Sequence, residues 1–227
     1  MIGGSTRLVG LLGQPVAHSL SPRLQNAAFA ARGLDYAYVA FDISPERLEK
    51  AVAGLVALGF AGANVTAPHK QAAAGICETV LDSVNTLVIR DGRVEGHSTD
   101  AAILGGLAAE RPVVIGGGGS AATFLEALPQ AQHFHRRGDW PPQVDDADLI
   151  VHATPVRDEV VVRIVQGQTL IDLPYPDSAT AAAARAAGAT VLDGLEVLVA
   201  QGAAAFELWT GVAAPVDVMR AAVGLRP

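Results

Sequence analysis

The sequence predicts an α/β protein built of two domains. Short apolar runs alternate with segments of helical spacing along most of the 227 residues, which is the pattern of strand–helix–strand units. The same alternation begins again near Pro112. A strong hairpin signal stands at Asp91-Gly92, and there are few others. Because parallel strands are joined by crossovers rather than hairpins, we expect mainly parallel sheets.

The first half of the chain predicts three strands, two helices and one hairpin. Ser21 is a natural N-cap for the first helix, with Pro22 in its first turn and Gly33 just past its end. Ser44 and Pro45 open the second helix in the same way. The expected elements are a strand at 8–12, a helix at 21–32, a strand at 36–41, a helix from 44, a strand at 62–66, and a hairpin at 83–96.

The second half predicts five further strands and several helices. The segment 139–142, which contains two prolines, interrupts the place where a helix would follow the second of these strands. An alanine-rich helix and a mostly helical tail complete the pattern. The expected strands lie at 112–115, 132–135, 148–151, 170–173 and 189–192, and the expected helices end near 128, span 179–187, and run from 195 to 225 with a break at 211–215.

Composition narrows the class of protein. Half of the residues are hydrophobic and the net charge is −7, with no basic stripe, which argues against a nucleic-acid partner. Cys77 is the single cysteine, so no internal disulfide forms and a reducing compartment is suited. Six scattered histidines make no convincing metal set. No apolar run suggests a signal core or a membrane span, and a cytoplasmic protein is expected.

Reactive side chains are expected where strands end. The stretch from Asn64 to Lys70 places an amide, a hydroxyl and an ammonium in one turn, since Pro68 cannot lie in a central strand. Asp100 lies at a second strand-to-helix junction. An ammonium and a carboxylate together can move a proton to or from a hydroxyl. The alternative is that Lys70 is a solvated surface charge and that Asn64 is an ordinary turn residue.

A glycine-rich turn predicts a dinucleotide site of the Rossmann type. Gly116 to Gly119 follow an apolar strand and precede a helix, an arrangement that seats a pyrophosphate on the helix N-terminus. The next strand ends in Arg136 and Arg137, where an acidic residue would bind a ribose hydroxyl. Arginines there suit a 2′-phosphate and favour NADP. The alternatives are a flexible linker and a pair of solvated arginines.

Several ordered motifs together resemble the shikimate dehydrogenase family over almost the whole chain. They include the loop 13–22, the Asn-Val-Thr-x-Pro-x-Lys motif at 64–70, and the blocks 84–86 and 99–100. The glycine-rich loop 116–121, the blocks 153–155 and 172–175, and the C-terminal signature 194–211 complete the set. The chain departs from the family pattern at Gln25, Ser98, Ala101, His152 and Val197, and in the shortened Rossmann half.

The resemblance implies NADPH-dependent reduction of 3-dehydroshikimate to shikimate, a step toward chorismate. Lys70 would be the catalytic group and Asp100 would orient it and share a substrate hydroxyl. Ser19 and Ser21 would bind the substrate carboxylate. The remaining substrate contacts implied are Asn64, Thr66, Asn85, Tyr175 and Gln201. The implied cofactor contacts are Gly116, Gly117, Gly118, Gly119, Ser120, Ala121, Arg136, Arg137, Thr154 and Gly194.

The resemblance also implies how the chain is divided. Residues 1–101, completed by 195–227, would form a substrate domain with the C-terminal helices packed back on it, and residues 102–194 a shortened NADP domain. The partner would be a small molecule, and the protein a monomer or a homodimer. Two alternatives stay open: a quinate or shikimate dehydrogenase with relaxed NAD or NADP use, and a non-catalytic module that binds shikimate or a nucleotide.

Overall fold

The computed structural model describes residues 2–175 and 177–226 and forms two compact units. Unit 1 contains the residues up to Thr99 together with those from Val199, and unit 2 runs from Asp100 to Leu198. The domain boundaries expected from the sequence lie after residues 101 and 194. Within the described residues, no helix is long and apolar enough to cross a membrane.

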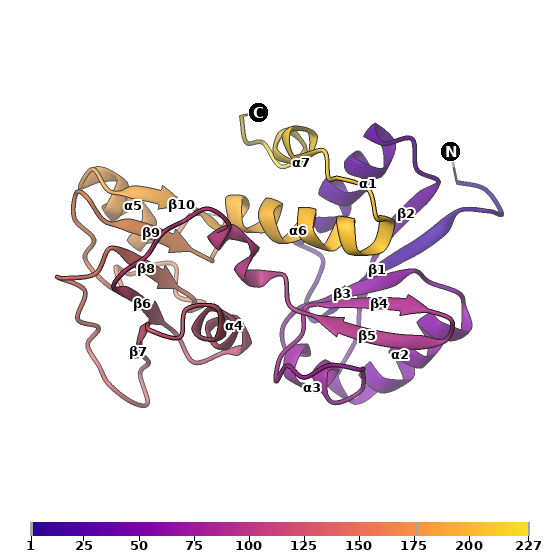
Figure 1. Cartoon of the computed structure of the whole chain (residues 1–227), viewed down its shortest axis with the longest axis horizontal. Helices are drawn as coiled ribbons and strands as arrows, with labels where there is room; N and C mark the ends of the chain where they lie inside the picture. Colours follow the sequence, from indigo (N-terminus) through magenta and orange to yellow (C-terminus); the bar gives the residue numbers. More distant parts are fainter. Residues whose placement is uncertain (1, 176, 227) are drawn as a thin grey trace. The chain divides into compact units, whose positions relative to one another are not determined.

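Unit 1 is built on a five-stranded sheet in the order β2-β1-β3-β4-β5 (Figure 1). The first three strands in this order are parallel, and β4 and β5 are antiparallel additions joined by the predicted hairpin. Asp91 and Gly92 both have positive φ there, as a tight hairpin turn requires. The strands are β1 (Arg7–Gly13), β2 (Tyr36–Asp42), β3 (Gly62–Val65), β4 (Thr86–Arg90) and β5 (Arg93–His97).

Helices cover both faces of this sheet. One face packs against α2 (Leu48–Ala57), preceded by a 3-10 turn at Pro45–Arg47, and against the short helix α3 (Lys70–Ala74). The other face carries α1 (Ser21–Ala31) and the later part of α6 (Gly194–Thr210), and α7 (Val216–Ala222) packs against α1 (Figure 1). Phe29 of α1 stacks on Phe206 of α6, with ring centroids 5.3 Å apart. The tail is therefore part of the core of unit 1.

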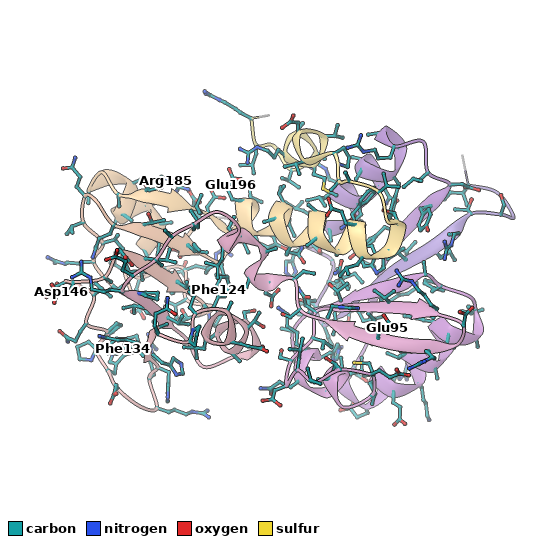
Figure 2. The ribbon with its side chains drawn as sticks, viewed as in Figure 1. Glu95, Phe124, Phe134, Asp146, Arg185 and Glu196 are labelled. Atoms are coloured by element: carbon teal, nitrogen blue, oxygen red, sulfur yellow. The ribbon has the colours of Figure 1, made fainter. Side chains whose placement is uncertain are left out.

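Unit 2 contains a second five-stranded sheet, all parallel, in the order β10-β9-β8-β6-β7. Helix α4 (Gly119–Ala127) packs on one face and α5 (Ala179–Ala186) on the other. Phe124 of α4 and Phe134 of β7, labelled in Figure 2, belong to these two separate cores. The strands are β6 (Pro112–Ile115), β7 (Gln132–Phe134), β8 (Leu149–His152), β9 (Thr169–Asp172) and β10 (Thr190–Leu192).

The predicted elements are confirmed with few exceptions. Residues 135–148, all described, contain no helix, as the prolines of that segment indicate. The prediction that Ser21 is the N-cap of α1 is wrong: Leu20 is the cap, and Ser21 is the first helical residue. The Ser21 N–H instead donates to Ser19 Oγ at 3.2 Å. Lys70, expected in a turn, is the first residue of α3.

Candidate active site

In unit 1, the two loops that carry the predicted substrate contacts lie side by side. The N–H of Gln14 donates to the carbonyl oxygen of Ala67 at 3.1 Å. A Cβ at Gly13 would overlap the Thr66 methyl group, so glycine is needed for this close approach. The loop with the two predicted serines, Ser19 and Ser21, therefore starts against the loop of Thr66. Ser19 is half-buried and Ser21 is buried.

Asn64 and Asn85 belong to one buried polar network at the ends of β3 and β4. The Tyr38 hydroxyl donates to Asn64 Oδ1 at 2.8 Å, and Asn64 Nδ2 donates to Thr86 Oγ1 at 3.0 Å. Asn85 Oδ1 accepts from the Thr99 N–H at 2.8 Å. Both asparagines are at most 5% exposed. These amides hold the strand ends together, which satisfies buried polar groups that would otherwise be costly.

Lys70, the last residue of the motif 64–70, is the first residue of α3. The N–H of Val84 donates to the Lys70 carbonyl oxygen at 3.1 Å, which ties the segment before β4 to α3. The preceding His69 is 1% exposed, and its Nε2 lies 2.9 Å from the Ile43 carbonyl oxygen. Buried and held in this way, His69 is part of the scaffold of unit 1. The Lys70 side chain is half-buried, as is Gln201 on α6.

Asp100 begins a 3-10 helix, Asp100–Leu104, in unit 2 and is 8% exposed. The hydroxyl of Ser120, in the first turn of α4, donates to Asp100 Oδ2 at 3.4 Å. A carboxylate near the N-terminus of a helix is stabilised by the helix dipole. Lys70 lies in unit 1, so its expected pairing with Asp100 stays a prediction. The contact with Ser120 joins one predicted catalytic residue to one predicted cofactor residue.

The glycine-rich turn has the backbone that a phosphate cradle requires. Gly116 has φ 144°, and a Cβ there would lie 2.6 Å from the carbonyl oxygen of Ala153. Gly118 is the N-cap of α4 and, as a glycine, has no side chain to bond the first N–H groups of the helix. Gly117 and Gly118 are exposed, and a Cβ at Gly118 would meet open space. An unobstructed backbone at a helix N-terminus is suited to binding an anion.

A pocket of about 670 Å³ opens beside this turn within unit 2. It lies at the carboxyl ends of β6, β7 and β8, the edge at which open parallel sheets bind ligands. A volume of this size suits a nucleotide-sized ligand. Its lining includes Gly116, Gly117, His133, His135, Arg136, Arg137, Trp140 and Thr154.

Arg136 already has partners in this pocket. Its guanidinium forms an ion pair with Glu159, with Nη2 2.5 Å from Oε1, and lies 5.7 Å from the centroid of the Trp140 ring. Both charged side chains are 62% exposed, so the pair is weak and a phosphate could replace the carboxylate. Five of the ten predicted cofactor contacts line the pocket: Gly116, Gly117, Arg136, Arg137 and Thr154.

Other predicted site residues lie away from the pocket lining. Ala121 is 1% exposed and packs in the core under α4. Gly194, at the start of α6, is needed because a Cβ there would lie 2.6 Å from the Leu173 carbonyl oxygen. Tyr175 is half-buried in the loop after β9. Geometry thus explains Ala121 and Gly194 by packing, and their assignment as cofactor contacts stays a prediction.

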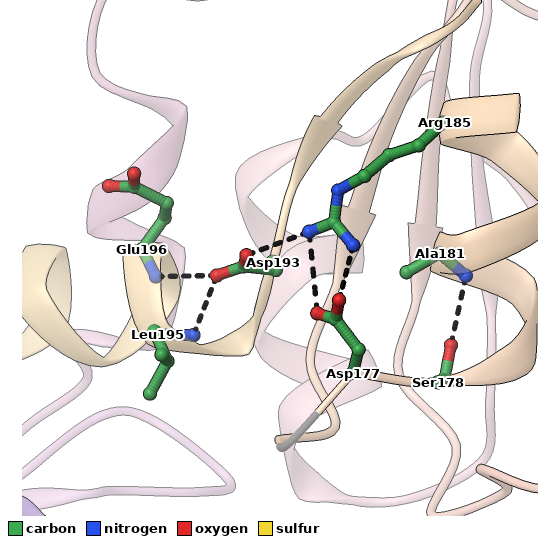
Figure 3. Close-up of polar contacts among 7 residues, drawn as sticks. All are labelled: Asp177, Ser178, Ala181, Arg185, Asp193, Leu195 and Glu196. Carbon is green, nitrogen blue, oxygen red and sulfur yellow. Dashed lines mark hydrogen bonds and ion pairs between the residues drawn. The ribbon is translucent and has the colours of Figure 1, made fainter. Parts of the chain in front are cut away.

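An arginine clamp fixes the chain where α6 begins (Figure 3). Arg185 bonds Asp177 and also lies 2.8 Å from Asp193 Oδ2. The hydrogen bond from Arg185 to Asp177, followed by the attraction of both carboxylates, raises the pKa of Arg185. Asp193 Oδ1 accepts from the N–H groups of Leu195 and Glu196, the first turn of α6. The clamp therefore fixes the first turn of α6 within unit 2.

Several residues of the pocket are not predicted from the sequence. His133 lies on β7 and His135 directly follows that strand, with ring centroids 4.9 Å apart, and the His133 Nε2 lies 2.6 Å from the Gly116 carbonyl oxygen. Trp140 stands in the proline-rich segment that looked only like a missing helix. The alternation His133-Phe134-His135 was an available signal, because side chains at i and i+2 share one side of a strand.

Two protein-family models match the chain. The model of the shikimate dehydrogenase substrate binding domain matches residues 11–87, which lie in unit 1. The model of the shikimate 5'-dehydrogenase C-terminal domain matches residues 194–223, the range of α6 and α7. The residues between these ranges include most of unit 2.

Similar proteins cover nearly all of the chain. The shikimate dehydrogenase (NADP(+)) of Anaeromyxobacter sp. strain Fw109-5 is 38% identical over 272 residues and covers 98% of either chain. The solved structure of shikimate dehydrogenase from Aquifex aeolicus is 30% identical, with a TM-score of 0.87, and covers 99% of this chain and 100% of that one. Shikimate 5-dehydrogenase from Thermus thermophilus, in complex with NADP(H) and shikimate, is 28% identical, with a TM-score of 0.83 and coverage of 96% and 98%. The predicted fold class is confirmed.

Proposed function

The chain belongs to the shikimate dehydrogenase family, and we propose on that basis that it catalyses the reversible NADPH-dependent reduction of 3-dehydroshikimate to shikimate. One observation carries the proposal most directly. The glycine turn, the start of α4 and the pair Arg136 and Arg137 line one pocket at the carboxyl edge of a parallel sheet. That combination suits a dinucleotide with an additional phosphate. A cytoplasmic location and a monomeric or dimeric state are further predictions.

The cofactor would be held by unit 2. The exposed backbone at Gly117 and Gly118 and the start of α4 would bind the pyrophosphate. Arg136 and Arg137 would bind the 2′-phosphate, and Arg136 would exchange its exposed partner Glu159 for that phosphate. Bound NADPH supplies the hydride. Shielded from water in such a pocket, each of these charge contacts gains strength.

The reaction needs a group that stabilises charge on the substrate oxygen. Reduction of a ketone builds negative charge on its oxygen, and an ammonium beside that oxygen both stabilises the charge and supplies the proton. We assign this role to Lys70, because it ends the polar motif that begins at Asn64. Asp100 would orient the ammonium and accept from a ring hydroxyl. Its contact with Ser120 would keep the carboxylate in one place.

Unit 1 would hold the substrate. The hydroxyls of Ser19 and Ser21 suit a carboxylate, and the loop that carries them starts against the loop of Thr66. The other proposed ring contacts in unit 1 are Asn64, Thr66, Asn85 and Gln201, and Tyr175 of unit 2 is proposed as a further one. Because Asn64 and Asn85 are held in a buried network, the atoms that they present to a ligand are fixed before binding. Such preorganisation lowers the entropy cost of binding.

A direct assay tests this function. Purified protein is mixed with shikimate and NADP+, and the absorbance of the reduced nicotinamide is followed. Turnover with this pair supports the proposal. Turnover with quinate and NAD+ in place of this pair would favour the relaxed quinate or shikimate dehydrogenase. Binding of either ligand without turnover would favour the non-catalytic module and overturn the proposed function.

A further inference from the structure

A buried carboxylate, imidazole and hydroxyl stand in a row beneath the pocket of unit 2. Asp172 Oδ1 lies 2.5 Å from His152 Nδ1, and His152 Nε2 lies 2.6 Å from Thr154 Oγ1. The first two side chains are 0% exposed, whereas Thr154 is half-buried and lines the pocket. A chain of hydrogen bonds therefore leads from the core of the unit to the surface that faces a ligand.

Sheet register aligns these groups. His152 ends β8, the central strand, and is the direct neighbour of Asp172 on β9. Both share a sheet face with Ile150 and Leu170, which pack against α5. A second oxygen, Asp172 Oδ2, is buried and has no hydrogen-bond partner among the described residues. A buried carboxylate with one free oxygen is costly unless a positive charge lies beside it.

Other charged groups surround the row. Arg185 of α5 is close enough to Asp172 for their attraction to raise the pKa of Arg185, but its hydrogen bonds go to Asp177 and Asp193. The pocket wall adds the guanidinium groups of Arg136 and Arg137 and the imidazole rings of His133 and His135. The loop after β8 adds the exposed side chains of Arg157, Asp158 and Glu159. His152 is the ring that contacts both Asp172 and Thr154.

The row formed by Asp172, His152 and Thr154 has two protonation states, one with a neutral and one with a charged His152 ring. An ionised Asp172 only accepts, so His152 Nδ1 carries a proton in both states. With a neutral ring, Nε2 accepts the proton of the Thr154 hydroxyl. Since Thr154 Oγ1 also accepts from the N–H of Val156 at 3.2 Å, it then offers the pocket one lone pair only. With a charged ring, Nε2–H donates to Thr154 Oγ1, and the hydroxyl proton is free to point into the pocket.

We propose that His152 and Asp172 are positioning residues that set the hydrogen-bond direction of the Thr154 hydroxyl, so that binding of the dinucleotide cofactor is coupled to proton uptake at His152. This inference rests on the proposed function, which assigns the pocket to that cofactor. Phosphate oxygens only accept hydrogen bonds at neutral pH. A phosphate oxygen at Thr154 therefore selects the charged ring, and the imidazolium adds attraction that Asp172 balances.

The test measures protons directly. NADP+ binding is followed by isothermal titration calorimetry at one pH in buffers of different ionisation enthalpy, which reports the protons taken up per cofactor bound. The wild-type protein should take up a fraction of a proton. Thr154→Val removes the hydroxyl at nearly constant volume and should lower both this uptake and the affinity, the latter about fivefold. Thr154→Ser should restore both.

A second variant tests the ring itself. His152→Asn keeps an amide donor for Asp172 but cannot take up a proton, so its uptake should fall to that of Thr154→Val. When NAD+, which lacks the 2′-phosphate, replaces NADP+, the difference in proton uptake between wild type and His152→Asn should be the same. His135→Asn is the control for the other pocket histidines, and the Thr154-dependent part of the uptake should survive in it.

Three results would overturn the coupling. Equal proton uptake in wild type and Thr154→Val is the first, and failure of Thr154→Ser to restore it is the second. Wild-type uptake in His152→Asn is the third. The two Thr154 variants keep both His152 and Asp172 in the chain, so the question is decided even where His152→Asn does not fold. Absence of cofactor binding to the wild type would overturn the proposed function as well, whereas normal turnover with equal uptake would overturn this inference alone.

Discussion

Two pairs of proposed ligand contacts, one pair in each unit, differ in burial. In unit 1, Asn64 and Asn85 are buried and hydrogen-bonded to Tyr38, Thr86 and Thr99, so they are part of the scaffold. In unit 2, the polar side chains around the pocket include exposed charges, such as Arg136 and Arg137, whose loss leaves no buried group unsatisfied. The same kind of prediction, a polar contact to a ligand, therefore has different physical consequences in the two units.

This difference separates two effects of mutation. Removing a buried, bonded amide costs stability because its partners lose their bonds without gaining water. Removing an exposed charge costs binding and little stability. The proposed substrate residues should thus report on folding as well as on activity, and the pocket arginines on cofactor binding alone. Lys70, half-buried at the start of α3, is the proposed exception in unit 1.

Lys70→Met should give the largest effect. Loss of the ammonium removes both charge stabilisation and the proton, so kcat should fall by ~10²–10⁴-fold while substrate binding changes little. Steady-state kinetics with shikimate and NADP+ measures this. Lys50→Met, on the exposed face of α2, is the matched control and should keep wild-type turnover. A Lys70 variant that keeps normal kcat would remove the lysine from the mechanism.

Asn85→Ala should destabilise the protein more than any change of a pocket arginine. The N–H of Thr99 and the hydroxyl of Thr86 both donate to Asn85 Oδ1, at 2.8 and 3.0 Å, and both donors are buried. Two stranded donors correspond to ~2–4 kcal/mol of unfolding free energy. Chemical denaturation followed by circular dichroism measures it.

Arg137→Ala is the control for that comparison. Arg137 is exposed beside the pocket, so the free energy of unfolding should stay within about 0.5 kcal/mol of wild type. Should Asn85→Ala prove equally harmless, the distinction between a scaffold unit and a ligand-facing unit would be wrong.

The sequence predicted most of the fold because its signals are local. Apolar runs such as 112–115 are buried strands, and Gly33 has the positive φ expected past a helix end. The cap of α1 was misplaced because Ser19, not Ser21, has its hydroxyl near the free N–H groups. Lys70 was placed in a turn because the few residues after it form only a short helix.

The site was predicted less completely, since its contacts depend on register between distant strands. His152 and Asp172 are neighbours only because β8 and β9 pair in parallel, which no local pattern reveals. Trp140 reaches the pocket from a segment that forms no regular element. The hydrogen bond from Ser120 to Asp100 likewise joins residues 20 positions apart. Motifs name which side chains carry chemistry, and pairing of strands decides which of them meet.

Arg136→Ala tests the proposed 2′-phosphate site of unit 2. Loss of a guanidinium that binds the 2′-phosphate should weaken NADP+ about tenfold and NAD+ hardly at all, with unchanged stability. Titration with both cofactors measures the two affinities. Glu159→Gln removes the competing carboxylate and should tighten NADP+ by a few-fold. Equal losses for NADP+ and NAD+ in Arg136→Ala would contradict the assignment of the phosphate site.

Asp148→Asn should have a small effect on stability, and this effect should depend on pH. Burial alone would raise the pKa of Asp148, but hydrogen bonds from the N–H groups of Glu110 and Arg111 outweigh burial and lower it. A lowered pKa stabilises the folded state above the pKa of the unfolded chain, and this contribution disappears as pH falls through the folded value. Because the carboxylate is largely exposed, the wild type should exceed the variant by no more than ~1 kcal/mol near neutral pH. Urea denaturation at neutral and at acidic pH measures the difference in unfolding free energy between wild type and variant, which should shrink in acid.

Asp146→Asn, a change at an exposed neighbour, is the control and should alter the unfolding free energy by less than about 0.5 kcal/mol at either pH. A difference for Asp148→Asn that stayed constant with pH would mean that the charge of Asp148 has no part in holding the start of β6.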